Sequence, residues 1–443
     1  MPASDHASYV LGVICGLLIL ALFVVALALA IRPMVRERDR RFAFACVLVL
    51  ALAIVKLALL QYLPGDTVDV MQFENWGSAI ARFGPAHIYD PEFLCKYTPA
   101  YLYPLWAASA MARNQPTHLR IFIESVPIIA DLLLALTVYA ASCRVAPRRL
   151  ALPATLLVAL NPTLIYASTE WGQNDSVLAL ALLLSVLMAA DSNYAIAWAL
   201  AIVAALIKAQ GLMLLPILAW WTLVTGSPTN WLRAAAAAIA TAVLVIIPFQ
   251  LGHPWHFVLD VYATSTGWFP WASVNAFNLM LALGGLLVPD NVKVWGPVSF
   301  FVLGNVLFGG AYLIAAWIAW RRRTAWGLMF SVFIVYLGMF VFLPRMHERY
   351  LYYALPLLAP LALGSWTTLA LYATLSVTLL LNMAYVFCDL VYVPGLVEDH
   401  LFIGPHGRPA IAIVNLAAFL LAAGYGLAVA ARNGSRSTAA SSR

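Results

Sequence analysis

The carboxylates best placed to do chemistry follow the second apolar segment of the chain. Asp66 and Asp69 lie there, and Lys96, Tyr97 and Tyr101 come later in the same polar stretch. Only 10% of the residues are charged, so a gathering of charged side chains at this point suggests a function. A carboxylate in such a place could act as a general base that takes a proton from a hydroxyl nucleophile.

Further polar clusters interrupt the later apolar segments, and we expect all of them at the outer ends of membrane spans. They comprise Glu170, Gln173, Asn174 and Asp175; Lys208 with Gln210; and Arg345, His347, Glu348 and Arg349. Ionisable groups near the hydrocarbon boundary are costly, so a functional role is the default hypothesis for them. Their cations could stabilise a phosphate that leaves a sugar, because that phosphate gains negative charge in the transition state.

The composition defines the class of protein. Hydrophobic residues make up 64% of the 443 residues, and the mean hydropathy is +0.89. These values exclude a soluble globule and predict an all-α polytopic membrane protein. The net charge of +6 reflects basic residues collected on one side of the membrane, so we expect no nucleic-acid partner.

The apolar runs predict thirteen transmembrane helices, with juxtamembrane helices on the outer face. The predicted spans are 8–31, 42–62, 119–143, 150–168, 175–190, 194–206, 209–224, 232–250, 296–319, 325–343, 350–363, 366–388 and 409–431. The run from Pro99 to Met111 is too short to cross a bilayer. The first ten residues carry no basic residue, whereas five arginines follow the first span. This asymmetry predicts an outer N-terminus and a cytoplasmic C-terminus.

The predicted organisation has four parts. Two N-terminal spans occupy 1–62, and a first outer loop with juxtamembrane helices and the carboxylates occupies 63–118. A transmembrane core at 119–431 carries outer loops at 251–295 and 389–408, and a disordered cytoplasmic tail is expected at 432–443. In the first loop, apolar residues recur at three- and four-residue intervals from Val70 to Phe83, which predicts a helix in the membrane interface.

Taken together, these motifs resemble the polyprenyl-phosphate-sugar-dependent glycosyltransferases of the GT-C superfamily. The resemblance is greatest to bacterial relatives of glycosylphosphatidylinositol mannosyltransferase II. It rests on Asp69 with Trp76 seven residues later, on Tyr97-Thr-Pro-Ala-Tyr101, and on three later motifs. Those are Trp171-Gly-Gln173-Asn174-Asp175, Leu206-Ile-Lys208, and His347-Glu348-Arg349 followed by Tyr352.

The resemblance implies an inverting hexosyltransferase, with mannose or glucose the expected sugar, in the inner membrane of a bacterium. Its donor would be a polyprenyl-phosphate hexose, and its acceptor a glycan, lipid or protein at the periplasmic face. Asp69 would be the general base, with Asp66 as its nearest competitor, and Lys208, His347, Arg349 and Arg345 would contact the donor phosphate. The sugar or acceptor pocket would be lined by Trp76, Tyr97, Tyr101, Glu170, Gln173, Asn174, Asp175, Glu348 and Tyr352.

No metal site or cofactor is expected, because the protein's own cations are available to the phosphate. A divalent cation held by carboxylate oxygens is possible in principle but not favoured, so activity in the presence of a chelator is expected. Transfer of the sugar to an acceptor in the membrane would make membrane lipid a further partner.

Simpler structural roles compete with each of these assignments. Asp69 could cap the helix that starts near Val70, and Lys208 could merely pair with Glu170 or Asp175. Residues 170–175 could satisfy the ends of a helical hairpin instead of lining a pocket. Lys56, inside the second span, indicates a structural ion pair more than a functional group.

A transporter or flippase of lipid-linked sugars is the alternative function, since it too would use a basic outer cluster. Transporters usually show internal repeats and polar groups near the membrane midplane. We find no repeat in the sequence, and its ionisable clusters are expected at outer helix ends. The enzyme hypothesis is therefore favoured.

Overall fold

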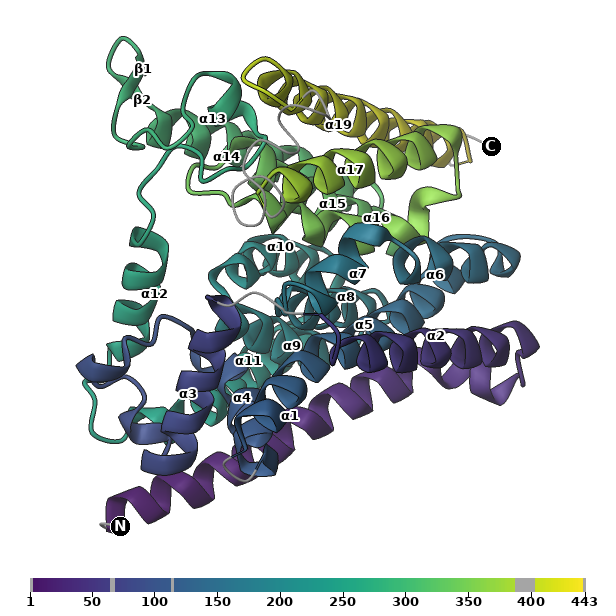
Figure 1. Cartoon of the computed structure of the whole chain (residues 1–443). Helices are drawn as coiled ribbons and strands as arrows, with labels where there is room; N and C mark the ends of the chain where they lie inside the picture. Colours follow the sequence, from purple (N-terminus) through teal and green to yellow (C-terminus); the bar gives the residue numbers. More distant parts are fainter. Residues whose placement is uncertain (1–2, 64–67, 113–114, 387–402, 441–443) are drawn as a thin grey trace. The chain divides into compact units, whose positions relative to one another are not determined.

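The fold is helical, as the composition predicts. The computed structural model describes residues 3–63, 68–112, 115–386 and 403–440, and nearly all of its regular elements are helices (Figure 1). The exception is a small antiparallel hairpin of β1 (Lys293–Trp295) and β2 (Val298–Ser299). The span predicted to start at residue 296 therefore begins as a helix only at Phe300. Asp66 and most of the predicted loop 389–408 lie outside the described residues.

Eight helices in the described part of the chain are long and apolar enough to cross a membrane. They are α1 (Ala3–Arg36), α2 (Arg40–Leu59), α5 (Pro116–Val145), α11 (Pro228–Gln250), α14 (Phe300–Arg321), α15 (Ala325–Phe342), α17 (Trp366–Ala384) and α19 (Gly407–Ala440). Each matches one of the thirteen predicted spans. The chain is therefore membrane-embedded.

The other five predicted spans are shorter or broken. Span 150–168 divides into α6 (Ala151–Ala159) and α7 (Pro162–Thr169), which are bent by 49°, because Pro162 has no N–H to continue the helix. The remaining four correspond to α8 (Asp175–Ala190), α9 (Tyr194–Ile207), η4 (Ala209–Leu214) with α10 (Leu215–Thr225), and η5 (Glu348–Tyr353) with α16 (Ala354–Ala362). The count of thirteen crossings stays a prediction for these segments.

Polar side chains set the starts of several long helices. Asp39 caps α2 by accepting from the Arg41 and Phe42 amides, and Ser227, Ser299 and Thr324 cap α11, α14 and α15. A cap satisfies backbone N–H groups that have no partner inside the helix. At the other end of the chain, α19 continues to Ala440, past the point where the sequence predicts a disordered tail to begin.

The chain divides into two compact units, which we describe separately. Unit 1 comprises Met1–Ala141, Leu164–Leu218 and Gly226–Gly267, and unit 2 comprises Ser142–Thr163, Ala219–Thr225 and Trp268–Arg443. Each has a helix that is apolar and buried nearly all round: α8 in unit 1 and α15 in unit 2. The most apolar stretch of α1, by contrast, is only 17% buried within the protein, against 89% for α15. Such an exposed apolar helix suits contact with lipid.

Two short helices of the first loop pack together in unit 1. They are α3 (Asp69–Phe83) and α4 (Pro99–Ala112), which lie side by side in Figure 1. The predicted helix from Val70 to Phe83 is confirmed, and so is a helix over the run from Pro99 to Met111. Gly77 permits the close approach, because a Cβ atom there would lie 2.8 Å from the Leu105 carbonyl oxygen.

The remaining short helices lie in the connections between longer ones. The short helices η1 (Pro85–His87) and η2 (Pro91–Phe93) connect α3 to α4, and α12 (Phe257–Gly267) follows α11. In unit 2, η3 (Arg148–Leu150) precedes α6, and α13 (Leu279–Ala282) lies in the second predicted outer loop. The predicted loop 251–295 therefore contains α12, α13 and β1, the first strand of the hairpin.

Candidate functional site

Asp69 is the first residue of α3 and does not cap it. The cap position is Val68, whose own side chain makes no capping hydrogen bond. Instead, Asp69 Oδ2 accepts a hydrogen bond of 2.5 Å from Gln173 Nε2, 104 residues further along the chain. The capping alternative is therefore wrong, and the Asp69 carboxylate is oriented by a residue of another candidate motif.

Gln173 lies in a tight turn between α7 and α8. The Trp171 amide donates to the Tyr166 carbonyl and the Gln173 amide to the Ala167 carbonyl, so the turn folds back on the end of α7. Gly172 has φ +63°, and a Cβ atom there would lie 2.8 Å from Val70 Cγ2. This position needs glycine both for its backbone conformation and for its contact with the first turn of α3.

The Gly172→Ala substitution tests this turn. The left-handed backbone conformation costs a non-glycine residue roughly 1–2 kcal/mol, and the clash with Val70 displaces Gln173 from Asp69. For the hexosyltransferase that the sequence predicts, we expect a large loss of sugar transfer with only a modest fall in the unfolding midpoint. Gly309→Ala is the matched control, because a Cβ atom at Gly309 meets no heavy atom within 4 Å in the described structure. Equal activity of the two variants would show that the turn geometry is irrelevant.

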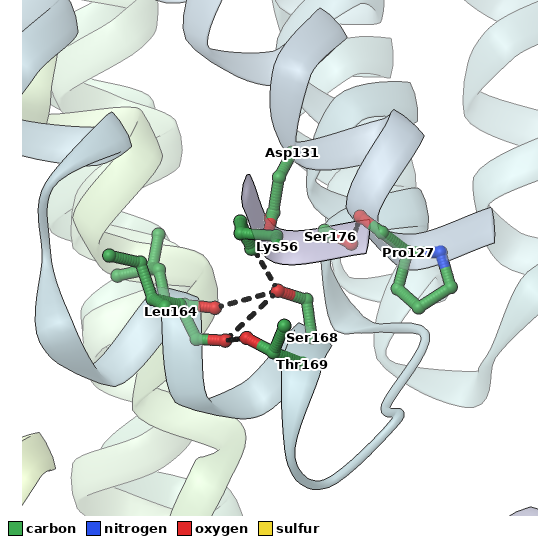
Figure 2. Close-up of polar contacts among 8 residues, drawn as sticks. Lys56, Pro127, Asp131, Leu164, Ser168, Thr169 and Ser176 are labelled. Atoms are coloured by element: carbon green, nitrogen blue, oxygen red, sulfur yellow. Dashed lines mark hydrogen bonds and ion pairs between the residues drawn. The ribbon is translucent and has the colours of Figure 1, made fainter. Parts of the chain in front are cut away.

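A buried ion pair holds the α7 side of this turn (Figure 2). Lys56 on α2 pairs with Asp131 on α5, and its ammonium group also donates to Ser168 Oγ at 2.7 Å. The Ser168 hydroxyl in turn donates to the Leu164 carbonyl, one turn back on α7. The prediction that Lys56 forms a structural pair is confirmed.

The α8 side of the turn is tied to the same helix. Ser176 Oγ donates to the carbonyl oxygen of Pro127 at 2.8 Å, a contact also drawn in Figure 2. Pro127 and Asp131 are four residues apart, so both lie on one face of α5. One face of α5 therefore anchors the segments on both sides of the turn that carries Gln173.

A group of aromatic rings stands next to Asp69. Phe73, one turn along α3, has its ring centroid 5.3 Å from that of Tyr97 and 5.4 Å from that of Tyr101. Trp76 packs on the same group, 5.4 Å from Tyr97, and donates its indole N–H to the Phe93 carbonyl. Phe73 and the predicted pocket residues Trp76, Tyr97 and Tyr101 thus form one aromatic wall.

Lys208 joins this wall to the start of α8. Its ammonium nitrogen lies 2.8 Å from Asp175 Oδ1 and 6.0 Å from the centre of the Tyr97 ring. The Asp175 side chain is fully buried and that of Lys208 is 9% exposed. The structural alternative for Lys208, pairing with Asp175, is thereby confirmed as a contact, and a further role of Lys208 in phosphate binding stays a prediction.

Lys96 is a cation beside the candidate base that the sequence analysis did not include among the site residues. Burial lowers the pKa of the Lys96 ammonium group, and the Asp69 carboxylate acts in the opposite direction. The charge of Lys96 thus partly balances that of Asp69. Its position directly before the predicted pocket residue Tyr97 is the feature of the sequence that indicates a place in the site.

A buried carboxyl on α5 also lies against the turn and was missed. Glu124 is fully buried, accepts from Arg120 Nε at 3.2 Å, and would touch a Cβ atom added at Gly172. Arg120 further donates to the Leu63 carbonyl at 2.6 Å. The signal in the sequence was the i, i+4 spacing of two opposite charges in an apolar span.

The last basic motif lies in unit 2. Arg349 Nη1 donates to Glu348 Oε1 at 2.7 Å, and His347 Nδ1 lies 3.9 Å from Glu348 Oε2. Glu348 and Tyr352 are almost completely buried. Glu348 is therefore the counterion of Arg349 and lies next to the His347 ring.

Arg345 is held in the same region of unit 2. Its backbone has φ +64°, its amide donates to the Trp271 carbonyl, and its Nε donates to Asp290 Oδ2 at 2.7 Å. The side chain is 30% exposed. Arg345 thus orders the second outer loop by a main-chain contact and an ion pair.

The candidate residues fall into two sets. Unit 1 contains Asp69, Trp76, Tyr97, Tyr101, Glu170, Gln173, Asn174, Asp175 and Lys208, whereas unit 2 contains Arg345, His347, Glu348, Arg349 and Tyr352. Contacts link Asp69 to Gln173, Asp175 to Lys208, and Lys208 to Tyr97. In the described ranges, no group of three or more His, Cys, Asp and Glu side chains is arranged to hold a metal ion.

Comparison with known proteins assigns no family to the chain. No protein-family model matches it, and a search of curated proteins finds no significant match. The functional conclusion therefore depends on the chemistry of the residues described above.

Proposed function

We propose that the protein is an inverting membrane glycosyltransferase that uses a polyprenyl-phosphate hexose. The observation that carries the proposal is the Asp69 carboxylate, which is held by Gln173 and lies near Lys96 and the aromatic wall. One oriented carboxylate suits deprotonation of an acceptor hydroxyl. The resemblance of the five motifs to GT-C enzymes agrees with this assignment.

In the proposed reaction, Asp69 takes the proton of an acceptor hydroxyl as its oxygen attacks the anomeric carbon of the hexose. The bond between that carbon and the phosphate oxygen breaks, and its electron pair leaves with the polyprenyl phosphate. Attack from the face opposite the leaving group inverts the anomeric configuration. The phosphate needs no protonation to leave, so a second catalytic carboxyl is not required.

Two sets of cations are candidates for binding the phosphate. Lys208 belongs to unit 1, and His347 with Arg349 belongs to unit 2. A preorganised cation stabilises charge that develops in the transition state more than the charge of the ground state. Both candidates already have carboxylate partners, which hold them in position. Single substitutions at Lys208 and Arg349 separate their contributions.

The proposal includes a location and an orientation. The enzyme would reside in a bacterial inner membrane with its N-terminus and active site in the periplasm and its C-terminus in the cytoplasm. The acceptor would be a glycan, lipid or protein on the outer face. Labelling of single cysteines at positions 6 and 432 with a membrane-impermeant thiol reagent, in a variant whose native cysteines are replaced, tests this orientation.

The decisive experiment measures sugar transfer by the purified protein in detergent. Chemically defined polyprenyl-phosphate mannose and glucose serve as donors, and the release of polyprenyl phosphate is followed in the presence of an acceptor panel. A transporter or flippase gives no transfer in detergent, where no compartments exist. Transfer that persists with a chelator present agrees with the cation arrangement, whereas a strict metal requirement contradicts it.

A further inference from the structure

Several buried polar atoms beside the aromatic wall make no hydrogen bond to any described residue. They are Asn174 Oδ1 and Nδ2, Tyr101 Oη, Thr98 Oγ1 and Gln173 Oε1. The side chains of Asn174 and Tyr101 are fully buried, and those of Thr98 and Gln173 are nearly so. A buried polar group without a partner costs stability, so such groups in a native structure call for an explanation.

The residues that carry these atoms adjoin the aromatic wall or the carboxylates Asp69 and Asp175. Tyr101 lies beside Tyr97, with 5.8 Å between ring centroids, and burial together with the nearby Asp175 carboxylate raises the pKa of the Tyr101 hydroxyl. Asn174 and Gln173 directly precede Asp175, and Gln173 binds Asp69. Thr98 directly follows Tyr97. The four residues therefore belong to the aromatic wall or lie next to it and its charged partners.

The chemistry of the set indicates what it could bind. An amide offers two donors and an acceptor, and each hydroxyl offers one donor and two acceptor lone pairs. Such groups satisfy ligand hydroxyls, which are themselves both donors and acceptors. Aromatic faces next to them suit the apolar C–H face of a sugar ring. The negative charges of the nearby carboxylates are already balanced: that of Asp175 by Lys208, and that of Asp69 in part by Lys96.

We propose that Asn174, Tyr101, Thr98 and Gln173 form a subsite for the hydroxyl groups of an uncharged sugar ring. This inference depends on the proposed function and narrows it: the cluster recognises the sugar, not the phosphate. A sugar acid is disfavoured, because its carboxylate would have to compete with Asp175 for Lys208 and with Asp69 for Lys96. The subsite therefore selects neutral hexoses against uronic acids.

The test uses methyl mannoside, methyl glucoside and methyl glucuronide as probes. Saturation-transfer NMR measures their binding to the purified protein in a detergent without a sugar head group, so that the detergent does not compete. We expect the neutral glycosides to bind and the glucuronide to bind at least tenfold more weakly. Equal or tighter binding of the glucuronide would overturn the proposal.

Two variants separate a binding role from a structural one. Asn174→Leu and Tyr101→Phe remove the polar atoms with little change in volume, and each is expected to weaken glycoside binding about tenfold. Because these atoms have no hydrogen-bond partner among the described residues, both variants should also raise the unfolding midpoint, as is common when a binding group is removed. A lower midpoint with unchanged binding would show that the groups serve the fold.

Matched controls complete the design. Asn305→Leu changes an exposed asparagine of α14, and Tyr336→Phe changes a fully buried tyrosine of α15. Neither should alter glycoside binding. Glycoside binding without transfer would refute the transferase and retain the subsite, whereas full transfer by Asn174→Leu would refute the subsite and retain the transferase.

Discussion

The transfer rate of the Asp69→Asn variant is expected to fall by a factor of roughly 10² to 10⁴, the range typical for removal of a general base. Asparagine has nearly the same shape, and its carbonyl oxygen can still accept the hydrogen bond from Gln173 Nε2. Folding and donor binding should therefore remain close to those of the unmodified protein. The measurement is the single-turnover rate of sugar transfer with saturating donor.

Two further variants are needed to interpret that result: a matched control and a variant of the competing carboxylate. Asp260→Asn is the matched control, because Asp260 lies on α12 with its side chain 65% exposed and pairs with His256. Its rate should be unchanged. Asp66→Asn tests the competing carboxylate, which lies outside the described residues. Full activity of Asp69→Asn together with loss in Asp66→Asn would transfer the role of base to Asp66.

The second large effect is expected at the Lys208 and Asp175 pair. In the Lys208→Met variant, Asp175 keeps a fully buried carboxylate without its cation. Removing one partner of a buried pair typically costs about 3–5 kcal/mol, because the remaining charge is uncompensated. We expect the free energy of unfolding in detergent to fall by about this amount, measured by denaturant titration.

The double variant Lys208→Met with Asp175→Asn then distinguishes the two roles of Lys208. It removes both charges, so most of the lost stability should return. Transfer should stay low, because the proposed phosphate contact is still missing. Recovery of transfer along with stability would show that Lys208 acts only as a counterion. Lys293→Met, at an exposed position of β1, serves as the control for a change of charge alone.

The local elements were the most predictable part of the structure. The helix from Val70 to Phe83 is confirmed as α3 because its apolar residues recur at helical spacing, which is a property of the local sequence. Where a proline interrupts an apolar run, as at Pro162, the run continues but the helix bends. Hydropathy averaged over a window does not detect such a break, and this explains the difference at 150–168.

The partners of the charged residues were less predictable. Lys56 pairs with Asp131, which is 75 residues away in the sequence, and Arg345 pairs with Asp290, which is 55 residues away. Glu124 was overlooked because nothing in its sequence neighbourhood indicates that it would lie against Gly172. Each of these contacts requires helices that are distant in the chain to pack together, and spacing along one helix does not reveal that.

The sequence by itself determined that this is a helical membrane protein, since length and apolar character alone decide whether a helix can cross lipid. It also determined which polar motifs interrupt the apolar runs. Only the tertiary structure decided that Asp69 is oriented by Gln173 and not used as a cap, and that Asp175 is the partner of Lys208. The physical reason is that a buried charge or amide takes its partner from whichever segment packs against it, and packing is decided by the whole fold.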